Sequence, residues 1–267
     1  MPVALDARPC ALLNIPADLV GGEKLALEVE SSCRDAYIAA KNEGDPRRKR
    51  ELVKIFTDAR REAFSRIVLN SQSFLTLTYW CTRLGLTTIR SEILPTTWEM
   101  YIFKSMLVRF QIHRLSIKRT KLRRINSYSA QTKTYPVLLA EEFSSKYVSQ
   151  VGTLLGYPQC CVERFVKDRV NNISAEARAS EQIRRLRDEG VELNLYVYFV
   201  KDFFPCSPSC MKAKAQGELI YRYISKLSPD AGERYKRLLA ENLSLVENYS
   251  EILRMHQEKL KFLRGQL

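Results

Sequence analysis

Histidine is nearly absent from this sequence of 267 residues, and several common catalytic motifs are missing altogether. Only His113 and His256 occur, and neither has a visible catalytic or metal-binding partner. The sequence contains no phosphate-binding loop, no GxGxxG dinucleotide motif and no GxSxG nucleophile elbow. These absences argue against the commonest nucleotide-dependent enzymes and against serine hydrolases.

Long apolar runs are lacking as well. No stretch of about eighteen apolar residues is present, so the sequence predicts no transmembrane helix and no membrane partner. The first residues lack the basic region followed by an apolar region that marks a signal peptide. We therefore expect a cytoplasmic protein, in which cysteines are usually free, metal-bound or catalytic.

Acidic residues are absent between Met100 and Ala140, where nine basic residues lie. The net charge of the chain is +13 and its pI is about 9.5, which favours polyanionic partners. Basic side chains neutralise phosphates, and aromatic rings stack on unpaired bases. We therefore expect RNA or DNA contact. The alternatives are a different acidic partner, or a solvated face balanced by acids such as Glu141 and Glu142. The candidate nucleic-acid-binding residues are Lys104, Arg109, Arg114, Lys118, Arg119, Lys121, Arg123, Arg124, Lys133, Tyr128 and Tyr135.

Helical spacing of apolar residues dominates the rest of the chain, and 45% of the residues are hydrophobic, as in a globular protein. The pattern predicts a mainly α fold in one domain spanning 1–267, with a small β element. Its cysteine-containing half spans about 139–227, and a long C-terminal helix covers about 229–264. The other expected helices are 24–41, 46–67, 74–84, 96–110, 139–155, 158–170, 175–189 and 208–227. Asp45 with Pro46 is expected to begin the second of these helices, Gly85 to end the third, and Thr96 with Glu99 to form a capping box at the start of the fourth. The candidate strands are 86–94, 110–117 and 193–204, and residues 120–136 are expected to form a loop.

Four of the seven cysteines occur in two short motifs, GYPQCCVERF (156–165) and FFPCSPSCMK (203–212). Gly156 is expected to end one helix and Pro158 to begin the next, which places Cys160 and Cys161 in its first turn. In the second motif, Ser207 is a candidate N-cap and Pro208 a candidate first helical residue. All four thiols, including Cys206 and Cys210, therefore belong to helix N-termini, where the helix dipole favours the thiolate.

The spacing of these four thiols allows three uses. The first is a metal site, the second a disulfide staple, and the third a set of free core cysteines. Tetrahedral zinc needs sulfurs within roughly 4 Å of one another, which is tight for adjacent cysteines, so the spacing favours an iron–sulfur cluster over zinc. The isolated residues Cys10, Cys33 and Cys81 are expected in the core.

The paired motif GYPxCC…PCSPxC resembles a family of uncharacterised, largely archaeal prokaryotic proteins, domain-of-unknown-function family 483. The resemblance covers about residues 153–227. It implies that Cys160, Cys161, Cys206 and Cys210 belong together, and it brings no established activity.

Together these patterns predict a metal-binding protein, with an iron–sulfur cluster, that contacts nucleic acid through its basic segment. A first alternative is a redox or sulfur-transfer enzyme that uses Cys206 and Cys210 as reactive thiols. A second is a disulfide-stapled binding module without enzymatic activity.

Overall fold

The computed structural model describes residues 2–129, 141, 144–252, 254–255 and 258. It divides the chain into two compact units. We call residues Cys10–Ser105 the sheet unit, and Met1–Pro9 with Met106–Leu267 the cysteine unit. The predicted mainly helical class with a small β element is confirmed. Whether the chain folds as one domain depends on whether its units fold independently, so the single domain stays a prediction.

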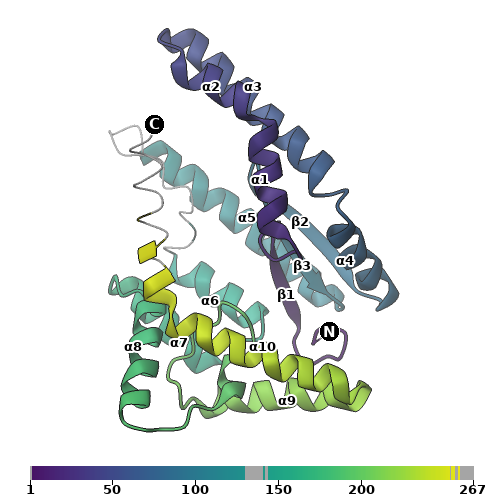
Figure 1. The fold of residues 1–267 in the computed structure, drawn as a ribbon, viewed down its shortest axis with the longest axis vertical. Helices are drawn as coiled ribbons and strands as arrows, with labels where there is room; N and C mark the ends of the chain where they lie inside the picture. The colour runs from purple at the N-terminus through teal and green to yellow at the C-terminus, as the bar shows by residue number, and fades with distance from the viewer. Residues whose placement is uncertain (1, 130–140, 142–143, 253, 256–257, 259–267) are drawn as a thin grey trace. The chain divides into compact units, whose positions relative to one another are not determined.

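The sheet unit contains four helices and a three-stranded antiparallel sheet among its described residues (Figure 1). The helices are α1 Gly22–Ser32, α2 Arg34–Asn42, α3 Pro46–Ile67 and α4 Gln72–Arg83. The strands are β1 Cys10–Ile15, β2 Thr87–Leu94 and β3 Thr97–Phe103, in the order β1-β3-β2.

Local signals in the sequence set the ends of several of these helices. Asp45 caps α3 by accepting a hydrogen bond from the Arg47 N–H, and Pro46 is the first helical residue, as predicted. Ser71 caps α4, and Gly85 follows that helix with a φ of 64°, as its predicted role at a helix C-terminus requires. The helix expected over 24–41 is divided at Cys33 into α1 and α2.

The predicted helix that begins with Thr96 and Glu99 is wrong, because this segment forms β3, the central strand. A spacing of four residues lies on one face of a helix and also on one face of a strand. The intervening Met100 completes the strand pattern, since Trp98, Met100 and Ile102 all pack in the apolar core of the sheet unit. β1 pairs with β3 from Cys10 opposite Phe103 to Ile15 opposite Trp98, and this pairing had no local signal.

The described part of the cysteine unit is helical. Its elements are α5 Met106–Ser129, α6 Ser145–Leu154, α7 Gln159–Val170, α8 Ala175–Asp188, the 3-10 helix η2 Leu195–Tyr198, α9 Met211–Leu227 and α10 Pro229–Glu247. Helix α9 packs against α10 (Figure 1). It also packs against η2. The predicted C-terminal helix extends beyond α10, and residues 253, 256–257 and 259–264 of that range lie outside the described residues.

Three expectations for this unit are wrong. The strand over 110–117 and the part of the loop over 120–129 both belong to α5. The buried residues Val108, Ile112 and Leu115 explain the first difference, because they recur at helical spacing. Arg119 and Arg123, which pair with Glu141, continue the helix into the second segment. The strand expected within 193–204 is replaced by η2, where the carbonyls of Tyr198 and Phe199 accept hydrogen bonds from α10 side chains instead of from a partner strand.

No helix in the described part of the chain is both long enough and apolar enough to cross a membrane.

Candidate metal centre

The first two cysteines of the centre are placed by the turn between α6 and α7. Gly156 follows α6 with a φ of 71°, and its N–H donates to the Thr153 carbonyl. A Cβ on this glycine would lie 2.6 Å from the Pro9 side chain, so the turn requires glycine. Pro158 is the N-cap residue of α7, one position before the first helical residue that it was predicted to be, and Cys160 and Cys161 lie in the first helical turn, as predicted.

The other two cysteines flank a short segment in front of α9. Cys210 is the N-cap of α9, whose first helical residue is Met211. The predicted roles of Ser207 as N-cap and Pro208 as first helical residue are therefore wrong by three residues. The Ser207 hydroxyl instead accepts a hydrogen bond from the Ser209 N–H in the turn before the helix.

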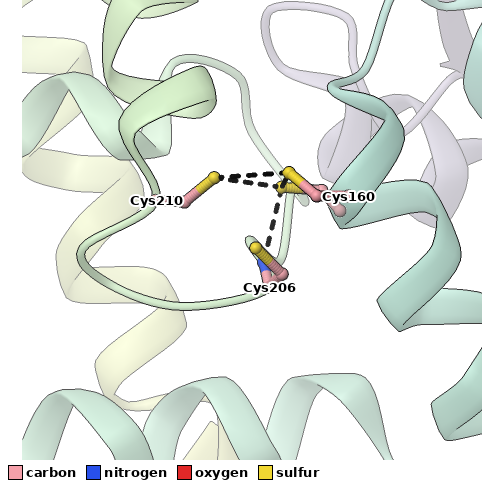
Figure 2. Close-up of side chains that lie close together, drawn as sticks. Cys160, Cys206 and Cys210 are labelled. Atoms are coloured by element: carbon pink, nitrogen blue, oxygen red, sulfur yellow. Dashed lines mark hydrogen bonds between the residues drawn. The ribbon is translucent and has the colours of Figure 1, made fainter.

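The four sulfur atoms converge. Sγ of Cys210 lies 3.7 Å from Sγ of Cys160 and 3.7 Å from Sγ of Cys161, and these two adjacent cysteines hold their own sulfurs 4.0 Å apart. With Cys206 included, all four sulfurs lie within 4.8 Å of one another. Figure 2 shows Cys160, Cys206 and Cys210 directed toward one point. This cluster can hold a metal ion.

All seven cysteines are among the described residues, and none of them forms a disulfide. Cys161 and Cys210 are buried, while Cys160 and Cys206 are half-buried at the edge of the same apolar core. As predicted, the remaining cysteines are core residues, since Cys10, Cys33 and Cys81 are all buried.

Electrostatics distinguish the thiols of the cluster. Burial raises the pKa of Cys161, although the Cys206 N–H donates to its sulfur at 3.4 Å and opposes that rise. Burial also raises the pKa of Cys206, to about 11. Burial acts in the same direction on Cys210, but the Ala213 N–H and the neighbouring thiols outweigh it and lower its pKa. The expected preference for thiolate at a helix N-terminus is thus met at Cys210 alone among these three.

A buried ion pair behind the cysteines was missed by sequence reasoning. Asp168, only 1% exposed, accepts hydrogen bonds from Arg164 Nε at 2.9 Å and from Arg178 Nε at 2.7 Å. Arg178 also donates to the carbonyls of Pro205 at 3.0 Å and of Cys206 at 3.4 Å. This arginine therefore ties α7 and α8 to the cysteine-bearing segment. The available signal was that Asp168 lies seven residues after Cys161, on the same face of α7.

The basic segment divides into a paired part and an exposed part. The buried carboxylate of Glu141 binds Arg119 Nε at 3.2 Å and accepts two hydrogen bonds of 3.0 Å from Arg123 Nε. Arg119 also lies over the ring of Tyr147. These two arginines therefore form internal ion pairs. This matches the alternative in which acids such as Glu141 balance the basic charges.

The other basic candidates lie in different surroundings. Arg109, Arg114 and Lys121 are exposed on α5, Lys104 is exposed in the sheet unit, and Lys118 is half-buried. Arg124 and Tyr128 belong to α5, whose side chains are described as far as Arg123. Lys133, Tyr135 and Glu142 lie outside the described residues.

Comparison with known proteins finds similarity in the segment that holds the cysteine centre. Residues 129–239 match the model of a family described as "Protein of unknown function (DUF483)", and this segment holds all four cysteines of the cluster. The chain is also 27% identical over 73 residues to an uncharacterised protein of Methanocaldococcus jannaschii. That alignment spans 27% of this chain and 38% of the relative. These two matches bear out the resemblance read from the sequence. No solved structure matches the chain.

Proposed function

We propose that Cys160, Cys161, Cys206 and Cys210 bind a single tetrahedral metal ion, and that this ion is zinc. Sulfurs at a Zn–S distance of about 2.3 Å lie about 3.8 Å apart at the corners of a tetrahedron. The three separations of 3.7, 3.7 and 4.0 Å among Cys160, Cys161 and Cys210 support this arrangement. They also answer the objection that adjacent cysteines cannot easily bring their sulfurs within roughly 4 Å of each other, because the sulfurs of Cys160 and Cys161 lie 4.0 Å apart.

An iron–sulfur cluster, which the sequence favoured, fits these separations less well. Such a cluster distributes its thiolate ligands over several iron atoms, so the ligand sulfurs stand farther apart than around one ion. Opening the site would require Cys161 to move, and this side chain is 2% exposed within the apolar core.

A structural role for the ion follows from the ligand set. Four thiolates fill the tetrahedral coordination of zinc and leave no open position for a substrate or a reactive water. The ligands join the first turn of α7 to the segment in front of α9, across 45 residues of chain from Cys161 to Cys206. An ion that binds only this folded arrangement stabilises it by mass action.

The direct test is purification of the full chain under anaerobic conditions, followed by zinc, iron and acid-labile sulfide analysis. We expect about one zinc per chain, no labile sulfide and no visible colour. Iron together with sulfide would instead support the cluster. A metal-free protein with a reactive Cys210 would support the thiol-dependent enzyme, since Cys210 has a lowered pKa. The variant Cys33→Ala is the matched control, because Cys33 is buried in the other core.

We also propose that the exposed part of the basic segment contacts nucleic acid. Arg109, Arg114 and Lys121 keep exposed positive charges on α5 after Glu141 has paired with Arg119 and Arg123. Phe110, 61% exposed on the same helix, offers a ring for base stacking.

Salt dependence tests this second function. Each phosphate contact with a single strand contributes a slope of about −0.7 to the plot of log affinity against log salt concentration. We expect a slope of about −2 to −3 from three or four contacts, measured by fluorescence anisotropy between 50 and 200 mM salt. An affinity that does not change with salt would contradict nucleic-acid contact through these side chains.

A further inference from the structure

A basic groove lies between α5 and α6 in the cysteine unit. Its volume is about 780 Å³. Arg114, Lys118 and Lys121 line it from α5, and Lys146 and Gln150 line it from α6. Leu115 and Leu154 are among the apolar side chains that also line it. The groove therefore combines four cationic side chains with an apolar surface.

Helical spacing explains how α5 separates its basic residues. Arg114, Lys118 and Lys121 follow one another at intervals of four and three residues, which places them on one face. Arg119 and Arg123 occupy a different face, where Glu141 neutralises them. The groove receives the face of α5 that carries Arg114, Lys118 and Lys121, and none of its lining residues in the described part of the chain is acidic.

The cations of the groove come from two helices and repel one another. Lys118 Nζ donates to Gln150 Oε1 at 2.8 Å, which holds its ammonium group against α6. Burial lowers the pKa of Lys118, and the charge of Lys146 lowers it further. Among the described residues no carboxylate forms an ion pair with Arg114, Lys118, Lys121 or Lys146. An anion bound in the groove would relieve this repulsion.

We propose that this groove binds the phosphate backbone of single-stranded nucleic acid. The inference rests on the nucleic-acid contact proposed above, and it assigns that contact to a site with a second wall on α6. The four cations bind successive phosphates, and the apolar side chains contact the sugars and base faces. A duplex presents its phosphates on a wide convex surface, which does not fit between two neighbouring helices.

Lys146 distinguishes binding in the groove from binding along the basic segment, because it lines the groove but lies outside Met100–Ala140 and was not a sequence candidate. Lys146 is exposed, so Lys146→Gln removes its charge without opening the core. Lys118→Gln removes the half-buried cation of the opposite wall. Lys167→Gln on α7 is the control, since Lys167 is also exposed but does not line the groove.

The experiment measures the binding of a labelled single-stranded oligonucleotide of mixed sequence to the metal-loaded full chain, by fluorescence anisotropy at 100 mM salt. Loss of one phosphate contact should weaken binding about fivefold at this salt concentration. We expect that loss for Lys146→Gln and for Lys118→Gln, a larger loss for the double variant, and unchanged binding for Lys167→Gln. Melting temperature and metal content should stay at the wild-type values for Lys146→Gln.

Four results would overturn the proposal. If wild-type protein binds but Lys146→Gln binds equally well while Arg109→Gln binds more weakly, the strand lies along α5 and outside the groove. In that case the nucleic-acid contact itself stands. If wild-type protein binds no oligonucleotide, both proposals fail. Tighter binding of a hairpin duplex would exclude the single strand as the preferred ligand. Full competition by a mononucleotide at equal phosphate concentration would show a nucleotide site in place of a strand site.

Discussion

Both apolar cores of the chain contain buried cysteines, but they use these residues differently. In the core of the sheet unit, Cys33 and Cys81 pack among aliphatic and aromatic side chains. Burial raises the pKa of Cys81, as expected for an inert core thiol. In the core of the cysteine unit, Cys161 and Cys210 are equally hidden, yet their sulfurs lie 3.7 Å apart and two more thiols join them.

The difference lies in the position of each cysteine within its secondary structure. Cys81 lies inside α4, where its side chain can only pack against neighbouring elements. Cys160, Cys161 and Cys210 belong to the starts of α7 and α9, and Cys206 lies in the loop between prolines. Helix starts supply unpaired N–H groups and allow several side chains to point toward one centre. Burial alone therefore does not single out a candidate metal ligand, whereas the convergence of several thiols on one point does.

The largest expected effect on the free energy of unfolding comes from removing one cysteine of the cluster, and removing one core cysteine serves as the comparison. Cys161→Ala should abolish tight metal binding and lower the free energy of unfolding by about 4 kcal/mol or more, the contribution expected of an ion present far above its dissociation constant. Cys33→Ala should cost about 1 kcal/mol, as for other small truncations in a core. Urea denaturation of the two variants with zinc present measures both values. Equal losses would remove the distinction between the two cores.

Removing the ion should affect the two units unequally. A strong chelator should speed amide exchange at least about tenfold in the first turn of α7 and in residues 205–210, because it raises the population of locally opened states. The amides of α3 in the sheet unit should exchange at an unchanged rate. Hydrogen exchange followed by mass spectrometry measures both regions in one sample. A uniform increase over the whole chain would contradict a local structural role.

The buried ion pair provides the next comparison. Asp168→Asn leaves Arg178 buried without a counter-charge and should lower the free energy of unfolding by about 3 kcal/mol. Glu163→Gln on the same helix is the control and should change it by less than about 0.5 kcal/mol, because Glu163 is exposed. Metal affinity should also fall in Asp168→Asn, since Arg178 holds the Pro205 and Cys206 carbonyls. Unchanged metal affinity would show that the ion pair does not support the metal centre.

The smallest expected change in stability concerns two glycines, which are replaced by alanine and compared. A Cβ at Gly217 of α9 would lie 2.0 Å from the Tyr196 carbonyl oxygen, whereas a Cβ at Gly44 would meet no atom within 4 Å. Gly217→Ala should therefore cost about 1–3 kcal/mol through overpacking against η2. Gly44→Ala should stay within about 0.5 kcal/mol of wild type. Thermal melting of the two variants is sufficient, and a larger shift for Gly44→Ala would contradict the packing at Tyr196.

The sequence was informative wherever structure depends on neighbouring residues. Asp45 with Pro46 predicted the start of α3, Gly85 the end of α4, and the Gly156–Pro158 turn the placement of Cys160 and Cys161. The candidate strand over 86–94 is found as β2.

Contacts between residues far apart in the sequence left no such signal in the local pattern. Strand β1 exists because Cys10 to Ile15 pair with β3, about ninety residues further along the chain. For the same reason the Asp168–Arg178 pair and the place of Lys146 in the groove could not be read from local patterns. The segment expected as a loop over 120–129 is polar, yet it continues α5, because Arg119 and Arg123 are held by Glu141.

X-ray absorption spectroscopy of the purified, metal-loaded chain can show whether one ion is held by four thiolates, since it reports the ligand atoms and their distances from the metal. We expect a zinc edge and a single shell of four sulfur atoms at about 2.3 Å, with no metal–metal scattering. Cys161→Ala should lose this signal, and Cys33→Ala should retain it. An iron edge with metal–metal scattering, or a shell containing nitrogen or oxygen ligands in the wild-type protein, would contradict a single ion held by these four thiolates.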